Sequence, residues 1–127
     1  MRKIMMVDDE ADQRHTLKIL LGERNNNEYE LLEAKSGTEC LQMLKNNQIP
    51  DVIILDIMMP GMSGWEAFEK IKENPTWNKI PVIFLTARTD ETAKKAGGFL
   101  GDDYVEKPYD INELIESIDK VIEKKKK

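Results

Sequence analysis

The chain has 127 residues, of which 40% are hydrophobic and 34% charged, and its formal net charge is −5. This length suits one domain with a core of ordinary size. An acidic body argues against nucleic acid as a direct partner, because phosphate backbones attract basic surfaces. No apolar stretch approaches the roughly 20 residues of a membrane span. We therefore expect a cytoplasmic protein without membrane insertion, and a single cysteine, Cys40, fits a reducing compartment.

Apolar runs typical of β-strands alternate along the chain with segments of helical periodicity. A first strand is predicted at Ile4–Val7, a helix over Glu10–Arg24 and a second strand at Tyr29–Ala34. A capping box at Ser36–Glu39 opens the second helix. The continuous β-branched run in Asp51–Asp56 is typical of a parallel strand that is covered on both faces.

The same alternation continues through the second half. A capping box at Ser63–Glu66 opens a third helix, and Pro81–Thr86 is the fourth strand. A short helix with little apolar character is expected over Asp90–Ala96, then a strand at Tyr104–Glu106 and a helix that begins with the capping box Asp110–Glu113. Five β-α units predict an α/β fold: a flavodoxin-like (βα)5 doubly wound parallel sheet with strand order 2-1-3-4-5.

Acidic, hydroxyl and ammonium side chains occur at the carboxyl ends of the predicted strands. Asp8 and Asp9 follow the first strand, Asp56 ends the third, Thr86 ends the fourth and Lys107 follows the fifth. Because the carboxyl ends of parallel strands share one edge of the sheet, we expect these side chains to meet there. Three neighbouring carboxylates repel one another unless a cation neutralises them. The pattern therefore predicts a divalent metal site beside groups that can hold an oxyanion.

The residue types also suggest a division of roles. A carboxylate such as Asp56 can act as a nucleophile toward phosphorus. Mg²⁺, with Mn²⁺ as a substitute, prefers a few carboxylates together with waters and phosphate oxygens. We expect Asp9 and Asp56 to be direct ligands, Asp8 to act through water, and the backbone carbonyl of Met58 to be a third protein ligand. Lys107 and a hydroxyl at position 86 would then contact phosphoryl oxygens.

Each of these residues has a simpler explanation when it is taken alone. Asp8 and Asp9 could cap the first helix, and Asp56 could be a solvated acid at a strand end. Tyr104, in a strand, would ordinarily serve packing. A cis Lys107–Pro108 bond could aim the lysine into the site, but cis is a minority state of about one X–Pro bond in twenty. The joint occurrence of the residues favours the site.

Four segments together resemble the receiver domain of two-component response regulators, in the order and spacing of that family. The segments are Val7–Glu10, Leu55–Gly64, Leu85–Ala87 and Asp102–Tyr109. The resemblance covers essentially the whole chain. It implies a phosphorylation-controlled signalling switch over residues 1–123, followed by a lysine-rich tail at 124–127.

The resemblance further implies that Asp56 accepts a phosphoryl group from a sensor histidine kinase or a phosphotransfer protein. Thr86 would move to bond the phosphoryl oxygen, Lys107 would pair with it, and Tyr104 would rotate between exposed and buried positions. A downstream protein target would read the face formed by the fourth helix, the fifth strand and the fifth helix. The protein would be a monomer that can dimerise on phosphorylation. It would promote its own phosphotransfer and dephosphorylation without turning over a separate substrate.

Other functions stay open at this point. The chain could be a receiver excised from a longer transcription regulator. A metal-dependent phosphohydrolase with Asp56 as nucleophile is less favoured, because position 58, where such an enzyme would carry a general acid, is methionine. A nucleotide or flavin binder is disfavoured, because the chain has no glycine-rich phosphate loop.

Overall fold

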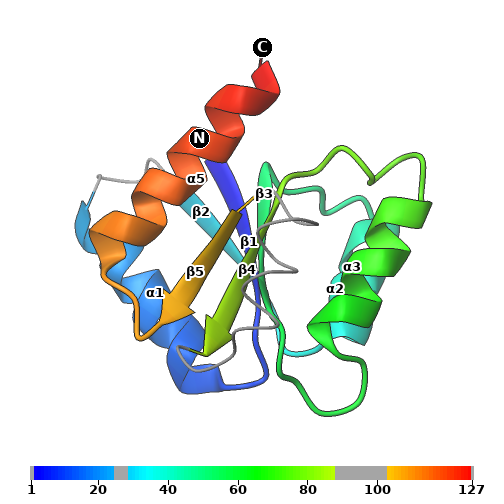
Figure 1. Ribbon diagram of the computed structural model, residues 1–127, viewed down its shortest axis with the longest axis horizontal. Helices are drawn as coiled ribbons and strands as arrows, with labels where there is room; N and C mark the ends of the chain where they lie inside the picture. Colours follow the sequence, from blue (N-terminus) through cyan, green and yellow to red (C-terminus); the bar gives the residue numbers. More distant parts are fainter. Residues whose placement is uncertain (1, 25–28, 88–102, 127) are drawn as a thin grey trace.

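Five parallel strands form a single sheet in the computed structural model, which describes residues 2–24, 29–87 and 103–126 (Figure 1). The strands are β1 (Arg2–Val7), β2 (Tyr29–Ala34), β3 (Val52–Asp56), β4 (Val82–Ala87) and β5 (Asp103–Lys107). Their order across the sheet is β2-β1-β3-β4-β5, and every neighbouring pair is parallel. The predicted strand order is confirmed. The helix expected at residues 90–96 lies outside the described residues.

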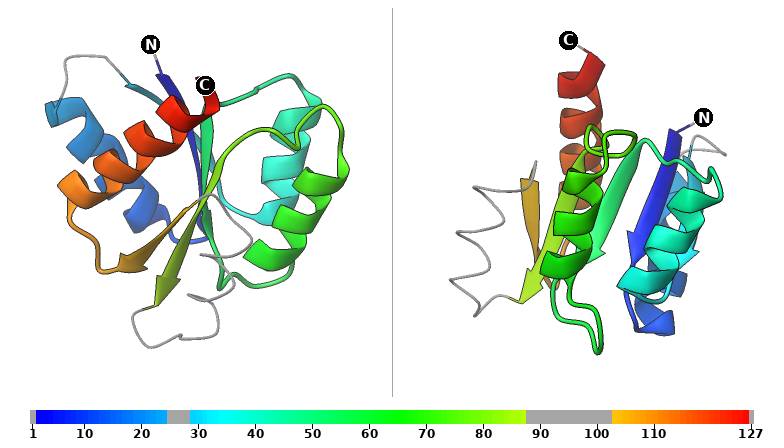
Figure 2. Two further views of the ribbon diagram at one scale, coloured as in Figure 1. Left: turned by 45° about the horizontal axis from the view of Figure 1, so that its top comes forward. Right: turned by 90° about the vertical axis from the view of Figure 1, so that its right-hand side faces the viewer.

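Helices cover both faces of the sheet. They are α1 (Ala11–Arg24), α2 (Gly37–Lys45), α3 (Gly64–Glu73) and α5 (Ile111–Lys126). Helices α1 and α5 lie on one face and α2 and α3 on the other, as Figures 1 and 2 show. This is the doubly wound arrangement that the alternation of strands and helices predicted. Within the described ranges, no helix is long and apolar enough to cross a membrane.

Two hydrophobic clusters, one on each face of the sheet, form the core. Successive side chains of a strand point to opposite faces, so neighbouring strand residues enter different clusters. The cluster beneath α2 and α3 includes Met5, Ile53, Leu55, Phe84, Phe68 and Ile71. The cluster beneath α1 and α5 includes Ile4, Ile54, Ile83, Leu17, Leu114 and Ile118. Because both faces of β3 are buried, the strand needs apolar residues at consecutive positions, and this explains its unbroken apolar run.

Side-chain caps define where three of the helices begin. Oγ of Ser36 accepts a hydrogen bond from the Glu39 amide at 3.0 Å, and Oγ of Ser63 accepts one from the Glu66 amide at 3.3 Å. Oδ1 of Asp110 accepts one from the Asn112 amide at 2.7 Å. Each cap satisfies a backbone N–H that has no partner inside its helix. The N-cap residue of each predicted capping box is confirmed.

Candidate functional site

The three predicted aspartates meet at the carboxyl edge of the sheet. Val7 pairs with Leu55 in the β1–β3 register, so Asp8, the next residue after β1, lies beside Asp56 at the end of β3. One carboxylate oxygen from each of Asp8, Asp9 and Asp56 lies within 4.8 Å of the others. Asp8 and Asp56 are buried, whereas Asp9 is exposed. Hard oxygen donors in this arrangement fit a divalent cation such as Mg²⁺.

Burial makes Asp56 a weaker acid than an ordinary aspartate. Loss of hydration raises the pKa of its carboxyl from 3.8 to about 6, with a contribution in the same direction from the charge of Asp8. The ammonium of Lys107 and the amide of Met58 oppose this rise. The Met58 amide donates to Oδ1 of Asp56 at 3.3 Å. The ionised form of Asp56 therefore depends on positive charge placed beside it.

Lys107 supplies such a charge from the end of β5. Its Nζ lies 3.3 Å from Oδ2 of Asp56 and 3.4 Å from Oδ2 of Asp8. Burial acts to lower the pKa of Lys107, but the two carboxylates outweigh it, so the pKa is raised. The following peptide bond, Lys107–Pro108, is cis, the isomer that the sequence did not favour. Lys107 is thus placed with the aspartates, as predicted.

Thr86 occupies the strand between these groups. It lies in β4, one position beyond Leu85, which pairs with Asp56, and its own register partner on β5 is Glu106. Its backbone is therefore at the same edge of the sheet as the acidic residues. The contact expected from its hydroxyl stays a prediction.

Asp8 also has a local structural role, although it differs from the helix cap that the simpler explanation proposed, because its partner Glu10 precedes α1. Its Oδ1 accepts a hydrogen bond from the Glu10 amide at 2.9 Å, so the carboxylate orders the turn that leads into α1. The same side chain reaches Lys107 through its other oxygen. Ordering the turn and belonging to the acidic site are compatible roles of one side chain.

Two residues that the sequence did not single out support the site. The side chain of Arg14 donates to the backbone carbonyl of Asp8 at 2.7 Å. Gly64, at the start of α3, packs so closely that an added Cβ would lie 2.4 Å from the carbonyl oxygen of Asp56. A helical-face argument could have found Arg14, which lies three residues before the buried Leu17. Gly64 lies in the segment Leu55–Gly64 that carries the resemblance, but helical periodicity does not show its contact with the Asp56 backbone, which depends on how α3 packs against the end of β3.

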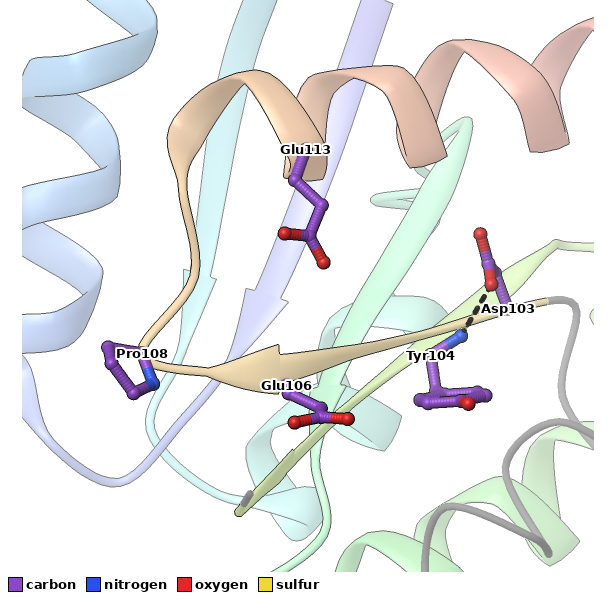
Figure 3. A pocket seen from close by; sticks show the side chains of 5 residues that line it. All are labelled: Asp103, Tyr104, Glu106, Pro108 and Glu113. Carbon is purple, nitrogen blue, oxygen red and sulfur yellow. Dashed lines mark hydrogen bonds between the residues drawn. The ribbon is translucent and has the colours of Figure 1, made fainter.

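Tyr104 lies on β5 and is 37% exposed. It lines a pocket of about 470 Å³ together with Asp103, Glu106, Pro108 and Glu113 (Figure 3). Its backbone amide donates to the carboxylate of Asp103 at 2.9 Å. An exposed ring is one of the two positions that the predicted switch requires. The rotation itself stays a prediction.

Residues 4–119 match the family of response regulator receiver domains. YvrH, a transcriptional regulatory protein of Bacillus subtilis, is 40% identical over 115 residues, which cover 87% of this chain and 45% of YvrH. PilH of Pseudomonas aeruginosa is 31% identical over 123 residues, which cover 96% of this chain and 98% of PilH.

The fold comparison agrees with the sequence comparison. The solved structure of a CheY-like response regulator receiver domain protein from Methanospirillum hungatei matches with a TM-score of 0.81 and 32% identity. The match covers 98% of this chain and 96% of that one. The chain therefore belongs to the response regulator receiver domain family of two-component signalling. It spans about half the length of YvrH and of other curated relatives that it matches, and nearly all of PilH.

Proposed function

We propose that this chain is a phosphorylation-controlled switch in which Asp56 accepts a phosphoryl group from a histidine kinase or a phosphotransfer protein. The observation that carries the proposal is the position of the Lys107 ammonium, within 3.4 Å of carboxylate oxygens of both Asp8 and Asp56. A cation beside a nucleophilic carboxylate is what transfer of an anionic group requires. Family membership supports the same role, because receiver domains are signalling domains.

The acidic cluster is the proposed Mg²⁺ site, with Mn²⁺ as a substitute. We assign Asp9 and Asp56 as direct ligands, Asp8 as a ligand through water and the carbonyl of Met58 as a further ligand. The raised pKa of Asp56 supports this assignment, because the buried carboxyl lacks enough neighbouring positive charge to keep its ordinary pKa, and a bound cation would supply that charge. When bound, Mg²⁺ supplies neutralising charge to the nucleophile and to the transferred phosphoryl oxygens.

The proposed chemical step is in-line transfer at phosphorus. A carboxylate oxygen of Asp56 forms the new oxygen–phosphorus bond, and the phosphorus–nitrogen bond to the donor histidine breaks. The electron pair of the broken bond goes to the imidazole nitrogen, which then takes up a proton. Lys107 keeps its proton and pairs with a phosphoryl oxygen, and the hydroxyl of Thr86 donates to another.

The proposed readout involves the surface around Tyr104. Phosphorylation would bias two pre-existing states, one with Tyr104 outward and one with its ring buried. The outward ring lies beside the pocket between β5 and α5, where a downstream protein can contact both elements (Figure 3). The chain is proposed to act as a monomer, with dimerisation on phosphorylation as a further state.

A test uses beryllofluoride, which stands in for the phosphoryl group on a carboxylate. With Mg²⁺ present, beryllofluoride should shift the amide NMR signals of Asp56, Thr86 and Tyr104 in the unaltered chain. The Asp56→Asn variant should not respond. A spectrum of the unaltered chain that stays unchanged under these conditions would falsify the proposal.

A second candidate is that this chain is the receiver part of a longer transcription regulator. It is favoured by one observation, which is that the match covers only 45% of YvrH, itself a transcriptional regulatory protein. The length of the complete gene tests it: an open reading frame that continues into a DNA-binding domain is the expected result. The phosphohydrolase alternative gains no such support, because Met58, two residues after Asp56, carries no acidic group.

A further inference from the structure

We propose that Arg14 is a positioning residue for the acidic site, and that it holds the turn bearing Asp8 and Asp9 in the geometry that binds the metal. The inference rests on the proposed function, since it concerns how well the same carboxylates hold Mg²⁺. Arg14 contacts neither the proposed ligand oxygens nor Asp56 among the hydrogen bonds of the described residues, so any effect must pass through the turn.

Arg14, on α1, connects its helix to the turn after β1 and to β2. Its Nη1 donates to the backbone carbonyl of Asp8 at 2.7 Å, and its Nε lies 3.2 Å from Oε1 of Glu33 on β2. The side chain of Arg14 is 15% exposed and that of Glu33 is 35% exposed, so the guanidinium is largely shielded from water whereas Glu33 is partly exposed. The Asp8 amide also donates to the carbonyl of Ala34 at 3.1 Å. Hydrogen bonds therefore connect the turn after β1 both to α1 and to the end of β2.

The contact to the Asp8 carbonyl bears on Asp9 as well. The carbonyl of Asp8 and the N–H of Asp9 belong to one planar peptide unit, so fixing the carbonyl fixes the direction in which the Asp9 backbone leaves the turn. The Asp9 side chain is exposed, so packing constrains it less than it constrains the buried Asp8. Arg14 is therefore placed to pre-organise an exposed ligand through the backbone.

The chemistry of the pair also explains why arginine suits this position. A guanidinium offers donors in a rigid planar fork, so it can serve the Asp8 carbonyl and the Glu33 carboxylate at once. A lysine offers a single nitrogen at the end of a flexible stem and would reach only one of them. Glu33 also neutralises the charge of Arg14, so the guanidinium adds no net positive charge that would repel a cation from the site.

The experiment compares Mg²⁺ binding by calorimetry in the unaltered chain, Arg14→Met, Arg14→Lys and the control Lys18→Met. Lys18 is exposed on the same helix, so its loss removes a similar side chain away from the turn. Arg14→Met should weaken Mg²⁺ binding about tenfold and Arg14→Lys by less, as is usual when a group that orients a ligand is removed, while the control stays close to the unaltered chain.

Two further measurements separate positioning from general stabilisation. In Mg²⁺-free protein, Arg14→Met should shift the amide NMR signals of Asp9 and Glu10, and urea unfolding should show each variant to be folded under the binding conditions. If Arg14→Met does not fold, the Mg²⁺ affinity of Arg14→Lys tests the inference in its place. Unchanged Mg²⁺ affinity in the folded variants would overturn this inference alone. Failure of the unaltered chain to bind Mg²⁺ would overturn the proposed function and this inference with it.

Discussion

The ammonium nitrogen of Lys107 lies 3.3 Å from Oδ2 of Asp56, although β4 separates the strands that carry the two residues. Two effects oppose each other at this contact. Burial favours the protonated form of Asp56, and the charge of Lys107 favours the ionised form. Replacing Lys107 should therefore lower the free energy of unfolding, and replacing Asp56 by a neutral residue should raise it. Unfolding experiments on the two variants can test both effects.

Lys107→Met should destabilise the Mg²⁺-free protein at neutral pH. The substitution leaves the carboxylates of Asp8 and Asp56 together without a neighbouring ammonium, and losing one partner of a partly buried pair should cost about 2 kcal/mol of unfolding free energy. Urea unfolding measures this change. Lys120→Met, at an exposed position of α5, is the control. Saturating Mg²⁺ should restore part of the loss, and equal stability of the two variants without Mg²⁺ would contradict the account.

Asp56→Asn should instead stabilise the Mg²⁺-free protein at neutral pH. The pKa of Asp56 is about 6 in the folded chain against an ordinary 3.8, so the folded chain binds this proton more tightly than the unfolded chain does. The contribution of Asp56 to stability is therefore complete below about pH 4 and is lost as the pH rises through about 6. The variant lacks this loss and should gain up to about 3 kcal/mol at neutral pH.

The pH profile of unfolding free energy provides the check on this prediction. Without Mg²⁺, the difference between Asp56→Asn and the unaltered chain should grow between about pH 4 and about pH 6 and then level off. Mg²⁺ should shrink the difference, because it restores charge balance around the ionised carboxylate. A difference that does not depend on pH would show that burial of Asp56 is not its cause.

Gly64→Ala should destabilise the protein and disturb the site. An added Cβ would lie 2.4 Å from the carbonyl oxygen of Asp56 and 2.7 Å from Cα of Ile57, both backbone atoms that cannot move aside cheaply. We expect a loss of about 2 kcal/mol or more, measured by thermal or urea unfolding. Gly22→Ala is a matched control within α1, where an added Cβ meets nothing within 4 Å. It should gain up to about 1 kcal/mol, because alanine favours a helix interior.

Parts of the fold and site followed from local sequence pattern, and other parts depended on packing between distant segments. The buried run Val52–Asp56 predicted a central strand because both faces of that strand need apolar residues. Asp8 and Asp56 could be placed together because the carboxyl ends of parallel strands meet at one edge. The contact of Gly64 with the Asp56 backbone depends on the angle at which α3 approaches the sheet, and no local pattern encodes that angle.

Arg14 illustrates the same limit on the other side of the site. Its position on the inner face of α1 can be derived from the spacing to Leu17, but its partners cannot. The Asp8 carbonyl and the Glu33 carboxylate come from the neighbouring turn and from β2, and they meet the guanidinium only once the β1–β2 register is set. The isomer of the Lys107–Pro108 bond likewise required the structure.

The central claim is that Asp56 is the residue that accepts the phosphoryl group. Tandem mass spectrometry after incubation with acetyl phosphate and Mg²⁺ tests it most directly, with Asp56→Asn and a Mg²⁺-free sample measured in parallel. The account predicts a single phosphoryl group located on Asp56 that is absent from both parallel samples. A phosphoryl group on another residue, or equal labelling of Asp56→Asn, would contradict it.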